Sequence, residues 1–156
     1  MPGRACAIVD FGAHNLTFYA FKEGMISYHR EHTFGGDELL QQLQRSSELP
    51  HDELAAQLRH GELDHTLMSL LENFANSAVQ QVSRALQFYS ASGSQEQLST
   101  LYVTGGLASL PGLTEKLYGD LGVDVHALDP FERKAGKLWH GNILILLLSP
   151  ILLLMV

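Results

Sequence analysis

The chain contains two stretches whose residue types could hold an anionic ligand. The first is residues 10–15, DFGAHN, in which an acid and a glycine follow a short apolar run. A carboxylate in this position could hold Mg²⁺ through water, while the N–H groups of the turn face a phosphate. The same pattern also fits an aspartate that only caps its own turn. A second group is therefore needed to support the binding hypothesis.

The second stretch is residues 101–113, LYVTGGLASLPGL, with the pair Gly105 and Gly106 at its centre. Two glycines after a strand let the chain turn sharply and leave no Cβ in the way of a ligand. The helix predicted near Pro111 adds an N-terminus, which favours anions. A tight connection that binds nothing has the same pattern. Together with the turn after Asp10, however, this stretch could enclose a nucleotide from two sides.

The elements that position these stretches are predicted in the order β-β-β-α-α-α-β-α-β. Three short apolar runs, residues 5–9, 16–21 and 25–33, are joined by tight turns and indicate an antiparallel meander. The later strands are predicted at residues 99–104 and 123–128. This order is typical of an α/β fold with a mixed sheet packed against helices.

Helices are predicted between these strands from apolar spacing and from capping residues. One begins after Gly36, a second begins near Pro50, and Asp64 can cap a third. The third is the best supported, because apolar residues recur at spacings of three and four from residue 67 to residue 89. A last helix follows Pro111 and ends at Gly122.

Composition excludes several classes of function. The chain has 156 residues and a net charge of −7, and it contains no basic cluster, so neither nucleic acid nor anionic lipid is an expected partner. Its one cysteine, Cys6, cannot form a disulfide within the chain and is expected to be a small buried residue in a reducing compartment. The first residues do not resemble a signal peptide, which favours a cytoplasmic location.

The end of the chain is unusually apolar. Residues 143–156, ILILLLSPILLLMV, contain almost no polar side chain. A membrane-spanning helix needs about 20 residues, and Pro150 would interrupt one here. A tail anchor, a buried segment and the non-native end of a shortened chain all remain open.

Taken together, the motifs resemble the actin-like ATPases, and most closely the PilM family of type IV pilus assembly proteins, relatives of the cell-division protein FtsA. Residues 10–15 with Thr17 are similar to the second phosphate loop, and residues 103–113 are similar to the adenosine loop. The resemblance covers residues 7–131. Three further stretches are similar to that family: residues 34–40 (FGGDELL), residues 79–89 (VQQVSRALQFY) and residues 128–131 (LDPF).

The resemblance implies the second lobe of an actin-like, ribonuclease H-like fold over residues 1–131, with a helical subdomain inserted at about 36–61. Residues 132–156 form a divergent apolar tail. Actin-like proteins hold ATP and Mg²⁺ between two lobes, and the first lobe would precede Met1. In the PilM family that lobe also carries the groove for the cytoplasmic tail of PilN. The chain therefore resembles half of a nucleotide site.

The resemblance also implies the residues that would contact the cofactor. Asp10 would hold Mg²⁺ through water. Two departures weaken the match: Leu16 replaces a threonine beside the phosphates, and Ala56 replaces an acid that can touch ribose. The residues implied at the ATP site are Asp10, Gly12, Ala13, His14, Asn15, Thr17, Arg59, Gly105, Gly106, Leu107 and Ser109.

Three functions remain open at this point. The first is a cytoplasmic scaffold of pilus assembly, peripheral at the inner membrane, that binds ATP with weak or no hydrolysis and has PilN as a partner. The second is a phosphotransfer enzyme similar to sugar kinases, which would need a base and a substrate pocket that no motif here supplies. The third is a tail-anchored membrane protein, which depends only on residues 143–156. His29 and His32 are expected on opposite faces of a strand and do not form a zinc motif.

Overall fold

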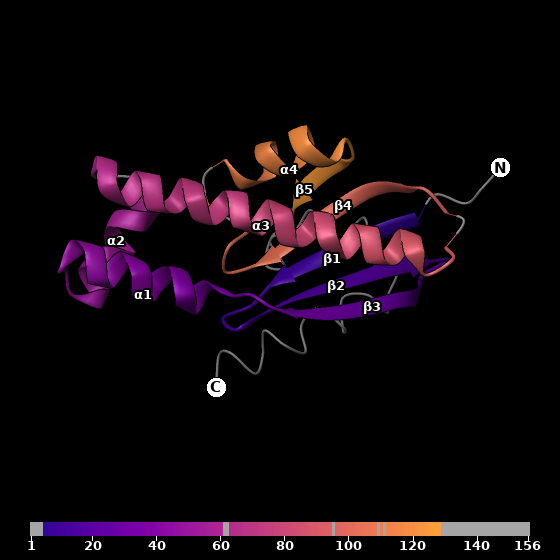
Figure 1. Cartoon of the computed structure of the whole chain (residues 1–156), viewed down its shortest axis with the longest axis horizontal. Helices are drawn as coiled ribbons and strands as arrows, with labels where there is room; N and C mark the ends of the chain where they lie inside the picture. Colours follow the sequence, from indigo (N-terminus) through magenta and orange to yellow (C-terminus); the bar gives the residue numbers. More distant parts are fainter. Residues whose placement is uncertain (1–4, 61–62, 95, 109, 111, 129–156) are drawn as a thin grey trace.

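The computed structural model describes residues 5–60, 63–94, 96–108, 110 and 112–128 (Figure 1). Its elements follow the predicted order, β1-β2-β3-α1-α2-α3-β4-α4-β5. The hypotheses about the apolar tail, residues 132–156, lie outside the described residues. None of the described helices is both long enough and apolar enough to cross a membrane.

One mixed sheet organises the fold. Strands β1, β2 and β3 form the predicted antiparallel meander, while β4 pairs parallel to β1 and β5 pairs parallel to β4. The order across the sheet is therefore β3-β2-β1-β4-β5. The bounds are β1 Ala5–Phe11, β2 Asn15–Lys22, β3 Met25–Thr33, β4 Leu98–Gly105 and β5 Asp124–Ala127.

The helices occupy two places relative to this sheet (Figure 1). The long helix α3 (His65–Ala91) and α4 (Leu113–Leu121) cover one face of the sheet. The shorter α1 (Gly36–Ser47) and α2 (His51–His60) project past the end of the sheet where β1 finishes. Helix α1 follows β3 directly, so its first residues lie beside the ends of the strands.

Helix α3 forms because its sequence satisfies both its cap and its apolar face. The Asp64 side chain accepts a hydrogen bond of 2.9 Å from the Leu67 backbone N–H, as the cap prediction requires. Residues at spacings of three and four face the core and are buried in one cluster with the inward residues of β1, β2 and β4. On α3 these are Leu67, Leu71, Phe74, Ala75, Ala78, Val79, Val82, Ala85 and Tyr89.

The alternation of β1 assigns its polar residues to the sheet face away from α3. Ala7, Val9 and Phe11 belong to the core, so Cys6 and Asp10 point to the opposite face. Cys6 is half-buried there, and burial raises the pKa of its thiol. The two histidines of β3 also separate as predicted: the His29 ring stacks on Tyr19, whereas the His32 ring lies beside Phe88 of α3.

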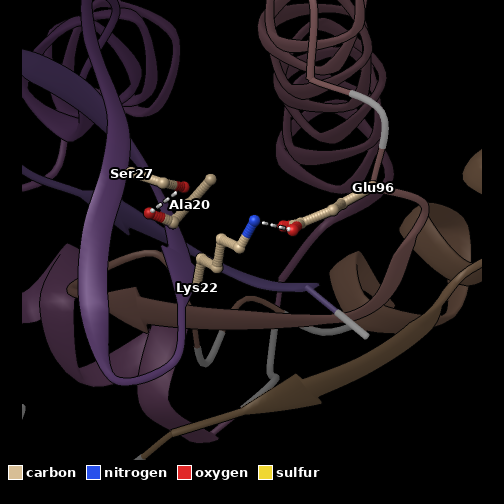
Figure 2. A network of polar contacts seen from close by, with 4 residues as sticks. All are labelled: Ala20, Lys22, Ser27 and Glu96. Carbon is tan, nitrogen blue, oxygen red and sulfur yellow. Dashed lines mark hydrogen bonds and ion pairs between the residues drawn. The ribbon is translucent and has the colours of Figure 1, made fainter. Parts of the chain in front are cut away.

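The end of the sheet far from α1 is held by polar contacts (Figure 2). Lys22 Nζ lies 2.6 Å from Glu96 Oε1, which joins the end of β2 to the connection before β4. Nearby, the Ser27 hydroxyl donates to the Ala20 carbonyl at 3.2 Å, where the pairing of β2 with β3 shifts register. The two stretches of interest lie at the opposite end of the sheet, because β1 and β4 run parallel and end there.

Candidate functional site

Three chain connections meet at the end of the sheet beside α1. They are the turn of residues 12–14 between β1 and β2, the junction of residues 34–35 between β3 and α1, and the connection that begins at Gly106 after β4. Because β1 and β4 run parallel and end together, Phe11 pairs with Gly105. The two stretches identified from the sequence therefore lie side by side, at the same end of two adjacent strands.

The sequence suggested that Asp10 lies after the first strand, in the loop before the second. In the structure Asp10 lies inside β1. It pairs with Thr17 on one side and with Thr104 on the other, so the ladders extend β1 two residues past the predicted end. These three residues lie at one level on the face away from α3. Thr104 is a buried polar residue beside Asp10, and the sequence analysis missed it because only the pairing reveals its neighbour.

The Asp10 carboxyl group is partly buried, and no described residue stabilises its charged form. Burial raises its pKa, and no charge or hydrogen bond from any residue that the structure describes lowers it. An aspartate that capped its own turn would accept an N–H bond, so the geometry does not fit the capping interpretation. A half-buried, unpaired carboxylate has the chemistry of a cation ligand.

Gly105 brings backbone next to this carboxylate because it has no side chain. Its φ of +95° is in the region that favours glycine. A Cβ there would also lie 2.2 Å from the Phe11 carbonyl oxygen and 2.8 Å from Asp10 Oδ1. The next residue, Gly106, is exposed, and a Cβ on it would have no heavy atom within 4 Å. Open space therefore begins at Gly106.

The 12–14 turn is compact and leaves two donors unused. Gly12 N–H donates to the Asn15 carbonyl at 2.9 Å, which closes the turn. Within the described ranges, the N–H groups of Ala13 and His14 donate to no acceptor. Successive free N–H groups in a turn form a concavity that suits an anion.

Two side chains at the turn contact neighbouring elements. Asn15 Nδ2 donates to Glu31 Oε1 of β3 at 2.6 Å, and His14 Nδ1 lies 3.1 Å from Asp37 Oδ2 of α1.

Three further residues predicted at the ATP site do not belong to the group formed by Asp10, Gly105 and the 12–14 turn. The Leu107 side chain packs against Gly36 at the start of α1, which ties the connection after β4 to the same corner. Arg59 belongs to α2, and its side chain lies outside the described set. Ser109 lies outside the described residues.

Gly35 is a residue of this corner that sequence reasoning assigned no role. A Cβ on it would lie 2.0 Å from the Ala13 carbonyl oxygen. The next two residues donate to the turn: Gly36 N–H to the Gly12 carbonyl at 3.1 Å, and Asp37 N–H to the Ala13 carbonyl at 3.0 Å. The one sequence feature that could have indicated a role for Gly35 is the glycine pair directly before the acidic first turn of a predicted helix.

Comparisons with solved structures show the fold of the actin-like ATPases. The PilM-PilN type IV pilus biogenesis complex matches with a TM-score of 0.69 and 21% identity, over 83% of this chain and 37% of that chain. The ethanolamine utilization protein EutJ from Carboxydothermus hydrogenoformans matches with a TM-score of 0.62 and 21% identity, over 80% and 44%. MreB5 of Spiroplasma citri bound to AMPPNP matches with a TM-score of 0.57 and 11% identity, over 80% and 48%.

The chain spans less than half the length of each of these structures. At these identities the likeness concerns the fold. The family is given by sequence: the family model of the type IV pilus assembly protein PilM matches residues 2–137, most of the chain. The chain therefore belongs to the PilM family of type IV pilus assembly proteins.

Proposed function

We propose that this chain contributes half of an ATP site to a type IV pilus assembly scaffold, with the 12–14 turn on the phosphates and the connection at Gly105 and Gly106 beside the adenosine. The observation that carries the proposal is the half-buried, unpaired Asp10 carboxyl next to a glycine backbone and a turn with two free N–H groups. Solved relatives of this fold bound to AMPPNP and ADPNP support a nucleotide as the ligand.

Asp10 fits the role of a ligand that holds Mg²⁺ through water. Mg²⁺ prefers carboxylate and water oxygens, and it commonly keeps several of its waters. A cation near Asp10 would favour the charged carboxylate and offset the burial that now raises its pKa. When bound, Mg²⁺ would neutralise phosphate charge. Thr17 and Thr104, paired with Asp10 across the sheet, lie beside it on the same face.

The biological role that follows is assembly, with weak or no ATP hydrolysis. One similar solved structure is a PilM-PilN type IV pilus biogenesis complex, so we propose PilN as a partner of the protein to which this lobe contributes. The proposed location is cytoplasmic and peripheral at the inner membrane. In this role, bound nucleotide would set the arrangement that partners recognise.

A single charged substitution tests the ATP site. Gly106→Glu should fold, because its Cβ meets open space, yet it places a carboxylate where the adenosine would bind. Gly119→Glu on α4 is the matched control, since its Cβ also meets open space and the charge change is the same. Amide chemical shifts recorded by NMR during titration with ATP and Mg²⁺ report binding at the 12–14 turn.

We expect saturable shifts in the unmodified chain and in Gly119→Glu, and their loss in Gly106→Glu and Asp10→Ala. Unchanged titration curves in both Gly106→Glu and Asp10→Ala would contradict the proposed ATP site.

A further inference from the structure

We infer that Gly35 and the first turn of α1 act as a positioning element that aims the free N–H groups of the 12–14 turn. This inference rests on the proposed function, because it takes those N–H groups to bind the phosphates of ATP. It adds residues that do not touch the ligand, and it links the site to helix α1.

The requirement for glycine at position 35 comes from space and not from backbone conformation. Gly35 has φ −157° and ψ 173°, an extended geometry that any residue adopts. A Cβ on it would, however, lie 2.0 Å from the carbonyl oxygen of Ala13, 2.3 Å from its carbonyl carbon and 2.5 Å from His14 N. All three are backbone atoms of one peptide group, which cannot rotate away as a side chain could. Any larger residue must therefore displace the turn.

Helix α1 uses the turn as its cap. The first N–H groups of a helix have no partner within the helix, and Gly35 at the N-cap position supplies no side chain. The donors from Gly36 and Asp37 are satisfied instead by the carbonyls of Gly12 and Ala13. Two consecutive peptide groups of the turn are thus held by α1.

This capping fixes the direction of the free donors. In a trans peptide the C=O and the N–H point in opposite directions, and the structure has no cis peptide bond among its described residues. The carbonyls of Gly12 and Ala13 point toward α1, so the N–H groups of Ala13 and His14, in the same two peptide groups, point away from it. The bonds from the helix therefore fix both donors in the direction away from α1.

A linkage between ligand and helix follows. The side chains of Leu39 and Leu43 are buried in the core and hold α1 in place. The first residues of α1 therefore have a fixed position from which they bind the turn. An anion on the free N–H groups should hold the two peptide groups more firmly, and so strengthen the bonds from Gly36 and Asp37. Such coupling is reciprocal by thermodynamic necessity.

Substitution of Gly35 tests this inference. Gly35→Ala should raise the dissociation constant for ATP and Mg²⁺ at least fivefold in an NMR titration of the chain. Gly119→Ala on α4 is the control, since its Cβ would meet no heavy atom within 4 Å and the residue lies outside this corner; its dissociation constant should stay within twofold. Without ligand, Gly35→Ala should shift the amide resonances of Ala13 and His14 but leave those of β5 in place. A general loss of stability would instead affect the resonances of β5 as well.

Hydrogen exchange in the unmodified chain provides a measurement that does not depend on a variant folding. ATP with Mg²⁺ should slow exchange of the Gly36 and Asp37 amides at least threefold. The Lys116 amide in the first turn of α4, bonded to the Gly112 carbonyl, should not change.

Failure of this inference is distinct from failure of the proposed function. If the unmodified chain shows no saturable shifts, the ATP site itself is wrong. If it binds, but Gly35→Ala binds within twofold or exchange at Gly36 and Asp37 is unaffected by ATP, the positioning role is wrong and the ATP site stands.

Discussion

At the scale of single residues, the site is marked by groups placed at a cost to stability. Asp10 is desolvated without a donor or a counter-charge in the described part of the chain, and Gly35 and Gly105 bring backbone groups within distances that no side chain permits. A fold selected for stability alone would fill these positions differently. Residues that oppose local stability are often retained for function.

The pKa of Asp10 leads to a prediction about stability. Burial raises it in the folded state, so the folded chain holds this proton more tightly than the unfolded chain does. Stability should therefore fall as pH rises from the ordinary carboxyl pKa through the raised one, and the loss persists above it. Asp10→Asn removes the charge, and it should stabilise the free chain at pH 7 by up to about 1 kcal/mol, because solvent still reaches part of the group.

Urea denaturation of both chains at neutral and acidic pH checks this. The difference should vanish where the carboxyl is protonated in both states. Asp124→Asn, at an exposed position that begins β5, serves as the control. A loss of stability in Asp10→Asn at pH 7 that persists unchanged in acid would contradict the burial argument.

At the scale of elements, Phe74 joins helix α3 to the site. Its ring stacks on Phe34, with centroids 4.9 Å apart, and Phe34 in turn meets Phe11 edge-on at 6.5 Å. Phe34 immediately precedes Gly35, and Phe11 immediately precedes the 12–14 turn. This aromatic row therefore holds both sides of the corner against the core.

Truncating this row should destabilise the fold strongly. Phe74→Ala removes a ring that is 6% exposed and should lower the free energy of unfolding by about 3–5 kcal/mol, because the loss of burial and the cavity add. Met68→Ala on the same helix is the control: its side chain is 53% exposed, so a change within about 0.5 kcal/mol is expected. Equal effects of the two substitutions in urea denaturation would contradict the assigned core face.

The sequence was sufficient to predict the elements, because periodicity, caps and turn residues are local. The Asp64 cap, the apolar face of α3 and the antiparallel meander are all confirmed. What it could not predict arises from pairing between distant segments. The position of Asp10 inside a strand depends on ladders with Thr17 and Thr104, and the contact of Gly35 with Ala13 depends on how α1 packs.

At the scale of the whole molecule, the described corner would contact the proposed ligand from one side only. Sites for small molecules usually bury most of the ligand surface in a cleft. Here the 12–14 turn and Gly105 lie at the same end of two neighbouring strands, Gly106 is exposed to solvent, and the chain spans 37% of the chain it matches in the PilM-PilN complex. If ATP lies between two lobes, as proposed from the resemblance, the remaining contacts would come from a first lobe.

This geometry predicts weak binding by the chain alone. With contacts to one side of ATP, we expect a dissociation constant on the order of 1 mM, which corresponds to about −4 kcal/mol. Isothermal titration calorimetry of ATP and Mg²⁺ into this chain measures the affinity, and Gly106→Glu, titrated in the same way, gives the background from contacts elsewhere. A micromolar dissociation constant that is lost in Gly106→Glu would contradict the prediction, because it would mean that these loops enclose the nucleotide without a second lobe. Millimolar affinity with the same loss in Gly106→Glu would agree with a half site whose strength depends on closure by the rest of an actin-like fold.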